Sequence, residues 1–363
     1  MAGLFIAFKY YDLKEYMMKN TTQSCILIVS FVLLLFTYGC KDTSNYLDTT
    51  LLTSTEFISS DKLTNPTSII ALDSFLVVGD LSSSSLEIYS ITDGSFLTTL
   101  GNFGKGPGEF EIIWTISKVY NESESIWIFD AALNRLTKYN VRSKQPLQMI
   151  TLKSGMPYSP VSVGDSLFIS PGFSLTAGRF AIFNKDGDYL RSIGTIPGER
   201  DENVPIPIHL QAYQGKLRIK PSQDKLVFST YYADRIDIYN NNGLILNTAF
   251  GASNTPPIYS ISTVGDIPVM ALSVANTRYG YIDVAVTDNY IYGLYSGRHL
   301  GDSYANLIHV YDWKGNNIIN YHLDYDVRAI SVCRNDQRLF AIREYPDLSI
   351  LLYNLAATPI VGT

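Results

Sequence analysis

The stretch Gly101-Asn-Phe-Gly-Lys-Gly-Pro-Gly-Glu-Phe110 decides the fold of this chain of 363 residues, and it holds four glycines and one proline in ten positions. Glycine permits positive φ and proline fixes φ, so the stretch predicts a sharp, specified turn rather than a flexible loop. Strand-like runs flank it, Phe96–Leu100 on one side and Phe110–Ser117 on the other. We therefore interpret it as a corner where the chain leaves one small sheet and enters the next.

A strand-turn-strand pattern recurs six times along the chain, each time around an apolar strand that ends in an aromatic residue. The six aromatic anchors are Tyr89, Tyr139, Phe183, Tyr239, Tyr311 and Tyr353. A second strand-like run precedes each anchor, and these runs are Phe75–Val78, Ile126–Phe129, Ser166–Ile169, Lys225–Ser229, Tyr290–Tyr295 and Arg338–Ile342. Short strands with turn signals, repeated at intervals of 42 to 72 residues, indicate a β-propeller. We predict an all-β, six-bladed β-propeller of four-stranded antiparallel blades.

The ends of the repeat predict how the ring closes. The final unit stops after Tyr353-Asn-Leu355 and has no outer strand of its own. A strand-like segment at Thr53–Ser59 precedes the first blade, and we expect this N-terminal strand to complete the last blade and remove an exposed sheet edge. A seven-bladed ring, with a degenerate blade in Ser253–Tyr281, stays open as the alternative. The body lacks sustained helical periodicity, so we expect very little helix.

The N-terminal residues indicate export. Cys25–Gly39 is an apolar run of fifteen residues, which is short for a spanning helix but typical of the apolar region of a signal peptide. The run ends at Gly39-Cys40, which resembles a bacterial lipobox, in which the cysteine becomes lipidated. Thr37 departs from the leucine usual in that motif. A retained membrane anchor and plain secretion stay open as alternatives to lipidation of Cys40.

These features divide the chain into four parts. Residues 1–39 are the predicted signal peptide, of which residues 1–16 precede the true start, because Met17 or Met18 would open a normal leader. Residues 40–55 are predicted to hold the lipidated Cys40 and a polar tether. The propeller is expected over residues 56–355, followed by a C-terminal tail over residues 356–363.

Composition narrows the classes of function. The net charge is −6 and the chain has no run of Lys or Arg, which argues against a nucleic-acid partner. Only Cys333 lies in the body of the chain, so no disulfide framework is expected. We expect a monomeric propeller whose contact with the membrane is the N-terminal lipid.

The second unit carries the residues of a known repeat. Gly106-Pro-Gly-Glu-Phe110 forms its corner, Ile126–Asp130 its second strand, and Asn134-Arg135 opens its third strand. This order resembles the NHL propeller repeat. The resemblance implies structural roles for Gly106, Gly108, Phe110, Asp130, Asn134 and Arg135. Asp130 and Arg135 are within reach across a hairpin, and we expect them to form a structural pair.

Two later segments, Ile291–Gly297 and Val310–Gly315, resemble the TolB-like six-bladed propeller lipoproteins of gram-negative bacteria. The resemblance implies the fold and a lipid anchor in a bacterial membrane. The outer membrane is the expected site, with the protein facing the periplasm or the cell surface. The resemblance implies no reaction, because propellers host many functions.

Ligand sites in propellers usually lie over one end of the central channel. By position, the candidate residues at the channel mouth are Glu109, Trp114, Tyr158, His209 and Arg328. His209 is expected at the entry to the fourth blade's inner strand, Ile208–Tyr213. Glu109 either points into the channel or caps backbone N–H groups of the glycine turn.

Motifs for catalysis or cofactor binding are missing from the sequence. The four histidines are His209, His299, His309 and His322, and their spacing does not match a zinc site. We therefore predict neither catalytic nor metal-binding residues and no cofactor. Calcium held in the channel by scattered Glu, Asn and Asp side chains stays open.

The sequence thus favours a membrane-tethered extracytoplasmic propeller that acts as a non-catalytic scaffold for a protein or carbohydrate ligand. The alternative is a propeller enzyme, a metal-assisted hydrolase or a lyase, with its site at the central channel. The long insertion Ser253–Gly280 would then be placed to cover the channel opening.

Overall fold

The computed structural model describes residues 49–355, with the exception of residues 60, 176 and 252. The predicted signal peptide, Cys40 and the predicted C-terminal tail lie outside the described residues. Within the described ranges, no helix is both long and apolar enough to cross a membrane.

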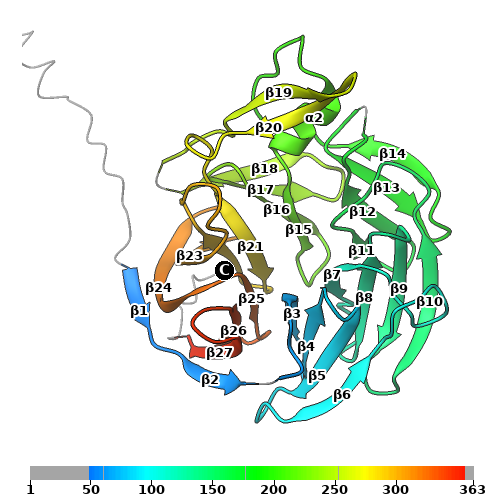
Figure 1. Cartoon of the computed structure of the whole chain (residues 1–363), viewed down its shortest axis with the longest axis vertical. Coiled ribbons are helices and arrows are strands. Elements are labelled where there is room, and N and C mark those ends of the chain that lie inside the picture. The colour runs from blue at the N-terminus through cyan, green and yellow to red at the C-terminus, as the bar shows by residue number, and fades with distance from the viewer. Residues whose placement is uncertain (1–48, 60, 176, 252, 356–363) are drawn as a thin grey trace, which may run out of the picture. The chain divides into compact units, whose positions relative to one another are not determined.

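The chain forms a ring of six antiparallel blades, which follow one another around the ring in sequence order (Figure 1). The first blade consists of β3 (Pro66–Ala71), β4 (Phe75–Asp80), β5 (Ser85–Ser90) and β6 (Phe96–Leu100). The second consists of β7 (Ile113–Lys118), β8 (Ser125–Asp130), β9 (Arg135–Asn140) and β10 (Gln145–Thr151). The third consists of β11 (Val161–Val163), β12 (Leu167–Pro171), β13 (Phe180–Asn184) and β14 (Tyr189–Ile193).

The other three blades follow the same order. The fourth consists of β15 (Gly215–Ile219), β16 (Lys225–Thr230), β17 (Arg235–Asn240) and β18 (Ile245–Phe250). The fifth consists of β21 (Tyr281–Val286), β22 (Tyr290–Tyr295), β23 (Ala305–Asp312) and β24 (Asn317–Val327). The sixth has β25 (Ala329–Val332), β26 (Arg338–Arg343) and β27 (Ser349–Asn354) from the C-terminal part of the chain. The all-β, six-bladed prediction is confirmed.

The N-terminal strands close the ring. β2 (Thr55–Ile58) pairs antiparallel with β27 and becomes the fourth strand of the sixth blade, as predicted. β1 (Thr49–Leu52) adds a parallel fifth strand to the outer edge of the fifth blade, next to β24. Figure 1 shows both strands on the rim of the ring, beside the last two blades. The structure differs from the predicted tether here, because residues 49–52 already belong to a sheet.

Two segments of the fourth and fifth units differ from the sequence prediction. The insertion between the fourth and fifth blades is a two-stranded hairpin, β19 (Tyr259–Val264) and β20 (Ile267–Leu272), so it does not form a seventh blade. The predicted inner strand Ile208–Tyr213 is instead the helix α2 (Ile206–Ala212), which begins with a proline in its first turn. Proline is compatible with the first turn of a helix, where its missing N–H costs nothing. The inner strand of the fourth blade follows α2 as β15.

The apolar core of the described residues consists of six clusters, one at each contact between neighbouring blades. Between the first two blades, for example, Leu86 and Ile88 pack with Phe110 and Ile126. All six aromatic anchors are buried in this core. Because neighbours cover both faces of a blade, a strand such as β4 is buried at every position. Burial on both faces explains the near-continuous apolar runs in the sequence.

The corner between the first and second blades is fixed by contacts to its backbone. The carboxylate of Glu109 accepts the N–H of Gly106 at 2.7 Å. Gly104 has a φ of 152°, and a Cβ at this position would lie 2.2 Å from Oε2 of Glu109, so the turn requires glycine here. Arg135 reaches across from β9 and donates to the carbonyl oxygens of Lys105, at 2.7 Å, and Glu109.

Asp130 and Arg135 act on the backbone rather than on each other, which corrects the expected pairing. The carboxylate of Asp130 accepts the N–H groups of Glu111 at 2.7 Å and Ala132 at 3.0 Å. Asp80 does the same at the end of β4, where it accepts the N–H groups of two residues before β3 and two after β4. A buried carboxylate that ends a strand thus satisfies turn N–H groups that would otherwise lack acceptors.

Candidate functional site

The inner strands surround a channel that contains three successive cavities. The cavity where the inner strands begin has a volume of about 430 Å³, the middle one about 40 Å³ and the one at the far end about 240 Å³. Arg218 lines both the first and the middle cavity, and Lys118 lines both the middle and the last. The middle cavity has room for a few waters at most. The first cavity, which we call the channel-mouth pocket, has the size of a small-molecule site.

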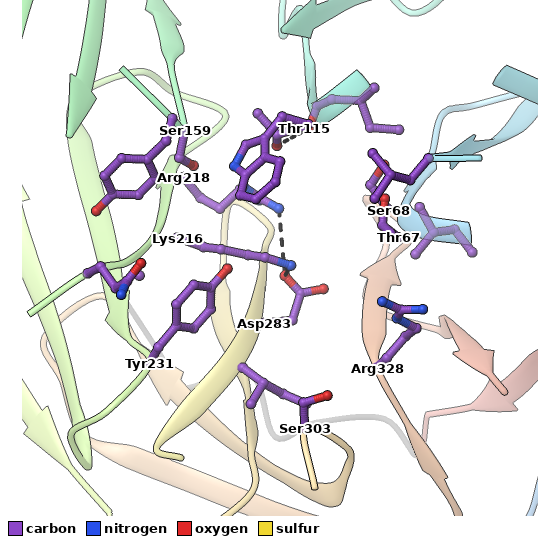
Figure 2. Close-up of a pocket in the computed structure, with 18 of the residues that line it drawn as sticks. Thr67, Ser68, Thr115, Ser159, Lys216, Arg218, Tyr231, Asp283, Ser303 and Arg328 are labelled. Atoms are coloured by element: carbon purple, nitrogen blue, oxygen red, sulfur yellow. Dashed lines mark hydrogen bonds and ion pairs between the residues drawn. The ribbon is translucent and has the colours of Figure 1, made fainter. Parts of the chain in front are cut away.

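Every blade contributes to the channel-mouth pocket (Figure 2). In blade order, one contributor from each is Ser68, Trp114, Ser159, Lys216, Asp283 and Arg328. These positions lie on the inner strands or directly before them, so the same structural position recurs around the ring. The pocket therefore forms only when the ring is closed.

The charged side chains of the pocket centre on one carboxylate. Asp283 lies 2.9 Å from Nζ of Lys216 and 3.6 Å from Nη2 of Arg218. Its second oxygen accepts the backbone N–H of Ile330 at 2.8 Å. Burial lowers the pKa of Lys216, Asp283 opposes this shift, and Arg218 and Arg328 add to it. The pocket thus contains more positive than negative charge, and its cations are partly desolvated.

Aromatic rings form the other part of the wall. Trp114 is 50% exposed although it lies on an inner strand. Tyr158 stacks on Phe173 with a centroid distance of 4.3 Å and an interplanar angle of 15°. Burial raises the pKa values of Tyr158 and Tyr231, so both hydroxyls stay protonated at neutral pH. The hydroxyl of Tyr231 points into the pocket beside Lys216 (Figure 2).

Three of the five candidate residues lie together in this pocket, namely Trp114, Tyr158 and Arg328. Arg328 is held there by Nη1, which donates to Asn65 Oδ1 and Glu344 Oε2, both at 3.1 Å. Glu109 does not line the pocket, because its side chain folds back on the N–H of Gly106.

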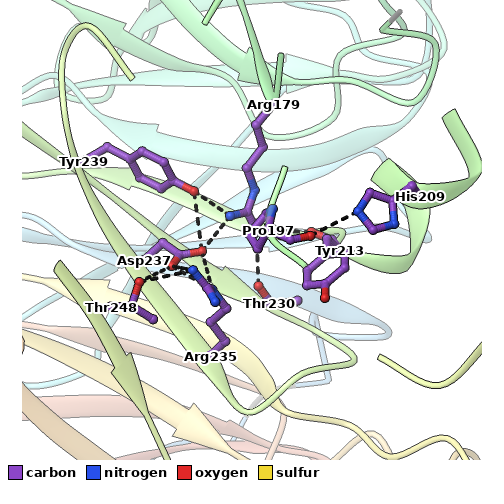
Figure 3. Close-up of polar contacts among 9 residues, drawn as sticks. All are labelled: Arg179, Pro197, His209, Tyr213, Thr230, Arg235, Asp237, Tyr239 and Thr248. Carbon is purple, nitrogen blue, oxygen red and sulfur yellow. Dashed lines mark hydrogen bonds and ion pairs between the residues drawn. The ribbon is translucent and has the colours of Figure 1, made fainter. Parts of the chain in front are cut away.

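His209 also lies outside the pocket lining, because α2 replaces the inner strand on which it was expected. Its Nε2 lies 3.0 Å from the carbonyl oxygen of Pro197, a contact drawn in Figure 3, and its Nδ1 lies 3.1 Å from the hydroxyl of Tyr259 on the β19–β20 hairpin. Burial lowers the pKa of His209, and the hydrogen bond to the Pro197 carbonyl opposes this shift. The residue connects α2 to the hairpin rather than facing the channel.

Three functional candidates escaped the sequence interpretation, namely Lys216, Arg218 and Asp283. Lys216 and Arg218 alternate with apolar residues in Gly215–Ile219, and period-2 alternation places both on one face of a strand. The prediction of an inner strand at Ile208–Tyr213 leaves this alternating stretch without a place in the blade. Asp283 had no distinguishing local signal, since it lies within an apolar strand.

The far cavity is lined by a different set of groups, which includes Asp73, Lys118, Glu122 and Arg334. Burial lowers the pKa of Lys118 to about 8. In the part of the chain that the structure describes, no group of three or more His, Cys, Asp or Glu side chains is placed to hold a metal ion.

Comparison with known proteins identifies the repeat. The sequence profile of the family described as TolB-like 6-blade propeller-like matches residues 44–335 of the chain. None of the curated proteins matches the chain.

Solved structures give the same architecture at low sequence identity. A protein of Bacteroides fragilis NCTC 9343, described as exported, is 15% identical with a TM-score of 0.50, over 83% of this chain and 94% of that one. A member of the DUF4221 family from Bacteroides vulgatus ATCC 8482 is 10% identical with a TM-score of 0.53, over 84% of this chain and 95% of that one. The WD40 repeats of RRP9 are 11% identical with a TM-score of 0.52, over 84% of this chain and 97% of theirs. At these identities the likeness concerns the fold alone.

Proposed function

Because the chain belongs to the TolB-like six-bladed propeller family, we propose that it is an exported, membrane-tethered propeller that binds a ligand in the channel-mouth pocket without transforming it. The observation that carries the proposal is the pocket itself, to which all six blades contribute charged, hydroxyl and aromatic side chains. A concave site with a few convergent polar groups is the usual form of a ligand site. Ring closure makes it rigid, which lowers the entropic cost of binding.

The chemistry of the pocket favours binding over catalysis. A general base needs a lone pair directed at the substrate. Asp283 uses Oδ1 for Lys216 and the N–H of Val284, both at 2.9 Å, and Oδ2 for the N–H of Ile330. The buried Tyr158 and Tyr231 stay protonated at neutral pH. The other charged side chains of the lining are the cations Lys216, Arg218 and Arg328, which suit recognition of a fixed charge.

The proposed location rests on the N-terminal sequence. The apolar run before Gly39-Cys40 and the lipobox resemblance support export and lipidation of Cys40. The Bacteroides fragilis protein of similar fold that is described as exported is in keeping with this location. We propose the outer membrane as the anchoring site, with the propeller outside the cytoplasm.

Tryptophan fluorescence provides a direct test of pocket binding. The chain has three tryptophans; Trp127 and Trp313 are 5% and 6% exposed, whereas Trp114 is 50% exposed and lines the pocket. Acrylamide quenching therefore reports mainly on Trp114. Compounds that raise the melting temperature in a metabolite screen should also protect Trp114 from acrylamide and should be recovered unchanged.

A pocket-filling variant serves as the control for that screen. Ser159→Phe places a large side chain on the pocket wall without adding a tryptophan, and it should abolish binding of every true ligand. A ligand that binds this variant as well as the natural chain would refute the pocket as the site. Recovery of a chemically altered compound would favour the enzyme alternative, a hydrolase or a lyase.

A further inference from the structure

We propose that the channel-mouth pocket recognises a ring-bearing carboxylate, with the carboxylate held by Lys216, Arg218 and Arg328 and the ring placed against Trp114. This inference rests on the proposed function and names the chemical class of its ligand. A carboxylated sugar and an aromatic acid share this chemistry.

The pocket lining carries a net positive charge. Three cations and one carboxylate line the pocket, in a chain whose overall net charge is −6. A cationic pocket on an acidic protein attracts small anions locally while the rest of the surface repels them. The glutamate that pairs with Arg328, Glu344, lies outside the pocket lining.

The cations of the pocket have hydrogen-bond donors to spare. Lys216 gives one of its three ammonium protons to Asp283. The hydrogen bonds of Arg328 to Asn65 and Glu344 both use Nη1, which leaves the Nη2 side of the guanidinium for a ligand. Asp283 orients Lys216 and Arg218 without neutralising the site. A ligand carboxylate would supply the missing acceptor, and Arg matches its geometry with two parallel hydrogen bonds.

The aromatic wall of the pocket favours a ligand that contains a ring. Trp114 exposes half of its surface from an inner strand, next to the stacked pair Tyr158 and Phe173. The exposed Trp114 ring beside a polar cluster suits a ligand with one flat apolar face and one polar edge. The hydroxyl of Ser159 accepts the N–H of Leu217 at 3.2 Å, and its own proton can be donated to a ligand. The volume of about 430 Å³ leaves room for a ring and its substituents.

Three probes test the inference on the mature chain. Glucuronate, benzoate and neutral glucose are titrated by calorimetry, and protection of Trp114 from acrylamide is measured in parallel. We expect at least one carboxylate to bind 10-fold or more tightly than glucose. Glucuronate alone identifies the ring as a sugar, and benzoate alone identifies it as aromatic.

Matched variants separate the pocket cations from general charge. Lys216→Gln keeps a donor for Asp283 but removes the positive charge, and it should weaken carboxylate binding about 10-fold or more. Lys153 forms an equivalent pair with Asp188 at 2.6 Å on the exposed surface, so Lys153→Gln should leave binding unchanged.

Two results would overturn the inference. Equal binding of glucose and the carboxylates, or equal loss in both lysine variants, excludes recognition of the anion. Failure of both carboxylates, in a protein whose Trp114 is protected by another compound from the metabolite screen, overturns this inference and leaves the proposed function standing. If neither the probes nor any screened compound protects Trp114, both proposals fail.

Discussion

The buried ion pair between Arg179 and Asp237 tests how neighbouring blades are held together. Arg179 directly precedes β13 of the third blade, and Asp237 lies on β17 of the fourth. Nη1 and Oδ2 are 2.6 Å apart, and the two side chains are 1% and 0% exposed. Arg179 also donates to the hydroxyls of Tyr239 and of Thr230, the latter at 3.2 Å, whereas Asp237 has a second cation, Arg235, with Nε 2.7 Å from Oδ1 (Figure 3).

The two partners therefore differ in what their loss leaves behind. Burial raises the pKa of Asp237, but Arg179 and Arg235 outweigh that effect and hold it below the usual value, so the carboxylate is ionised at pH 7. Asp237→Asn removes the carboxylate that Arg179 and Arg235 share and leaves the buried Arg179 without a counter-charge, and breaking a buried pair in this way costs about 3–5 kcal/mol. Arg179→Met leaves Asp237 with Arg235 and with the hydroxyl of Thr248 at 2.7 Å. We expect the second variant to lose about 1–3 kcal/mol, as for hydrogen bonds to a charged group.

Urea unfolding at pH 7 measures both losses as differences in the free energy of unfolding. The double variant should lose less than the two single losses combined, because the partners are in direct contact. Lys153→Met removes an exposed pair with Asp188 and should leave the free energy of unfolding almost unchanged, because solvent screens such a pair. A loss in Arg179→Met equal to or greater than that in Asp237→Asn would refute the reasoning, since it would mean that Arg235 does not compensate Asp237.

Three further predictions concern acid stability, anchoring and ring closure. His309 is buried, its Nδ1 lies 2.9 Å from the Tyr281 hydroxyl, and burial lowers its pKa to about 4. In the unfolded chain the imidazole takes up a proton near pH 6.5, so this group should lower the free energy of unfolding by about 3 kcal/mol between pH 6.5 and pH 4. The variant His309→Gln should lack this pH dependence. An unchanged pH dependence in the variant would assign the effect to other groups. Cys40→Ala should move the protein from the membrane to the soluble fraction of the cell envelope, and continued sedimentation with membranes would contradict lipidation. A chain that begins at residue 61 lacks β1 and β2, whereas a chain that begins at residue 53 lacks only β1. The shorter chain exposes the partners of the buried Ile58, so it should lose more than about 2 kcal/mol relative to the longer one; equal urea midpoints would show that β2 does not seal the ring.

The blade repeat was predictable because its signals are local. Each anchor such as Tyr89 or Tyr353 ends a short apolar strand that is followed by turn residues, and a propeller repeats that unit with the same packing at every blade contact. The last unit has no outer strand after Tyr353, and the chain has one unpaired strand-like segment before the first blade, which forms β2 and supplies that strand. The six blades could therefore be predicted by counting the local repeats of apolar strand, aromatic anchor and turn.

The helix α2 shows where local pattern was insufficient. Its seven residues, Ile206–Ala212, form a short apolar run, and such a run does not distinguish a buried strand from a buried helix. The error moved the predicted inner strand ahead of its true position at β15. As a result, His209 was placed near the channel, and Lys216 and Arg218 were left out of the site.

The site itself is non-local, and this limits what sequence can reveal. Ser68 and Asp283 line one pocket although more than two hundred residues separate them in the sequence. Trp114 is recognisable because it lies in the strand-like run Phe110–Ser117, which overlaps β7, whereas Arg328 is a candidate by position alone and directly precedes β25. Asp283 is not recognisable in this way, because its role depends on Lys216 from the neighbouring blade. A pocket residue is recognisable from sequence only after its blade has been placed in the correct register.

The corner at Gly101–Phe110 belongs to the local blade repeat and also positions a residue of the non-local pocket. Glu109 and Arg135 fix its backbone, and Phe110 enters the core between the first two blades with its side chain fully buried. Three residues later β7 begins, and its second residue, Trp114, faces the channel-mouth pocket. Ile113, Thr115 and Ile116 line the pocket together with Trp114, so the corner sets which part of β7 forms the pocket wall. The glycine-rich turn therefore positions one wall of the channel-mouth pocket, although none of its own side chains lines that pocket.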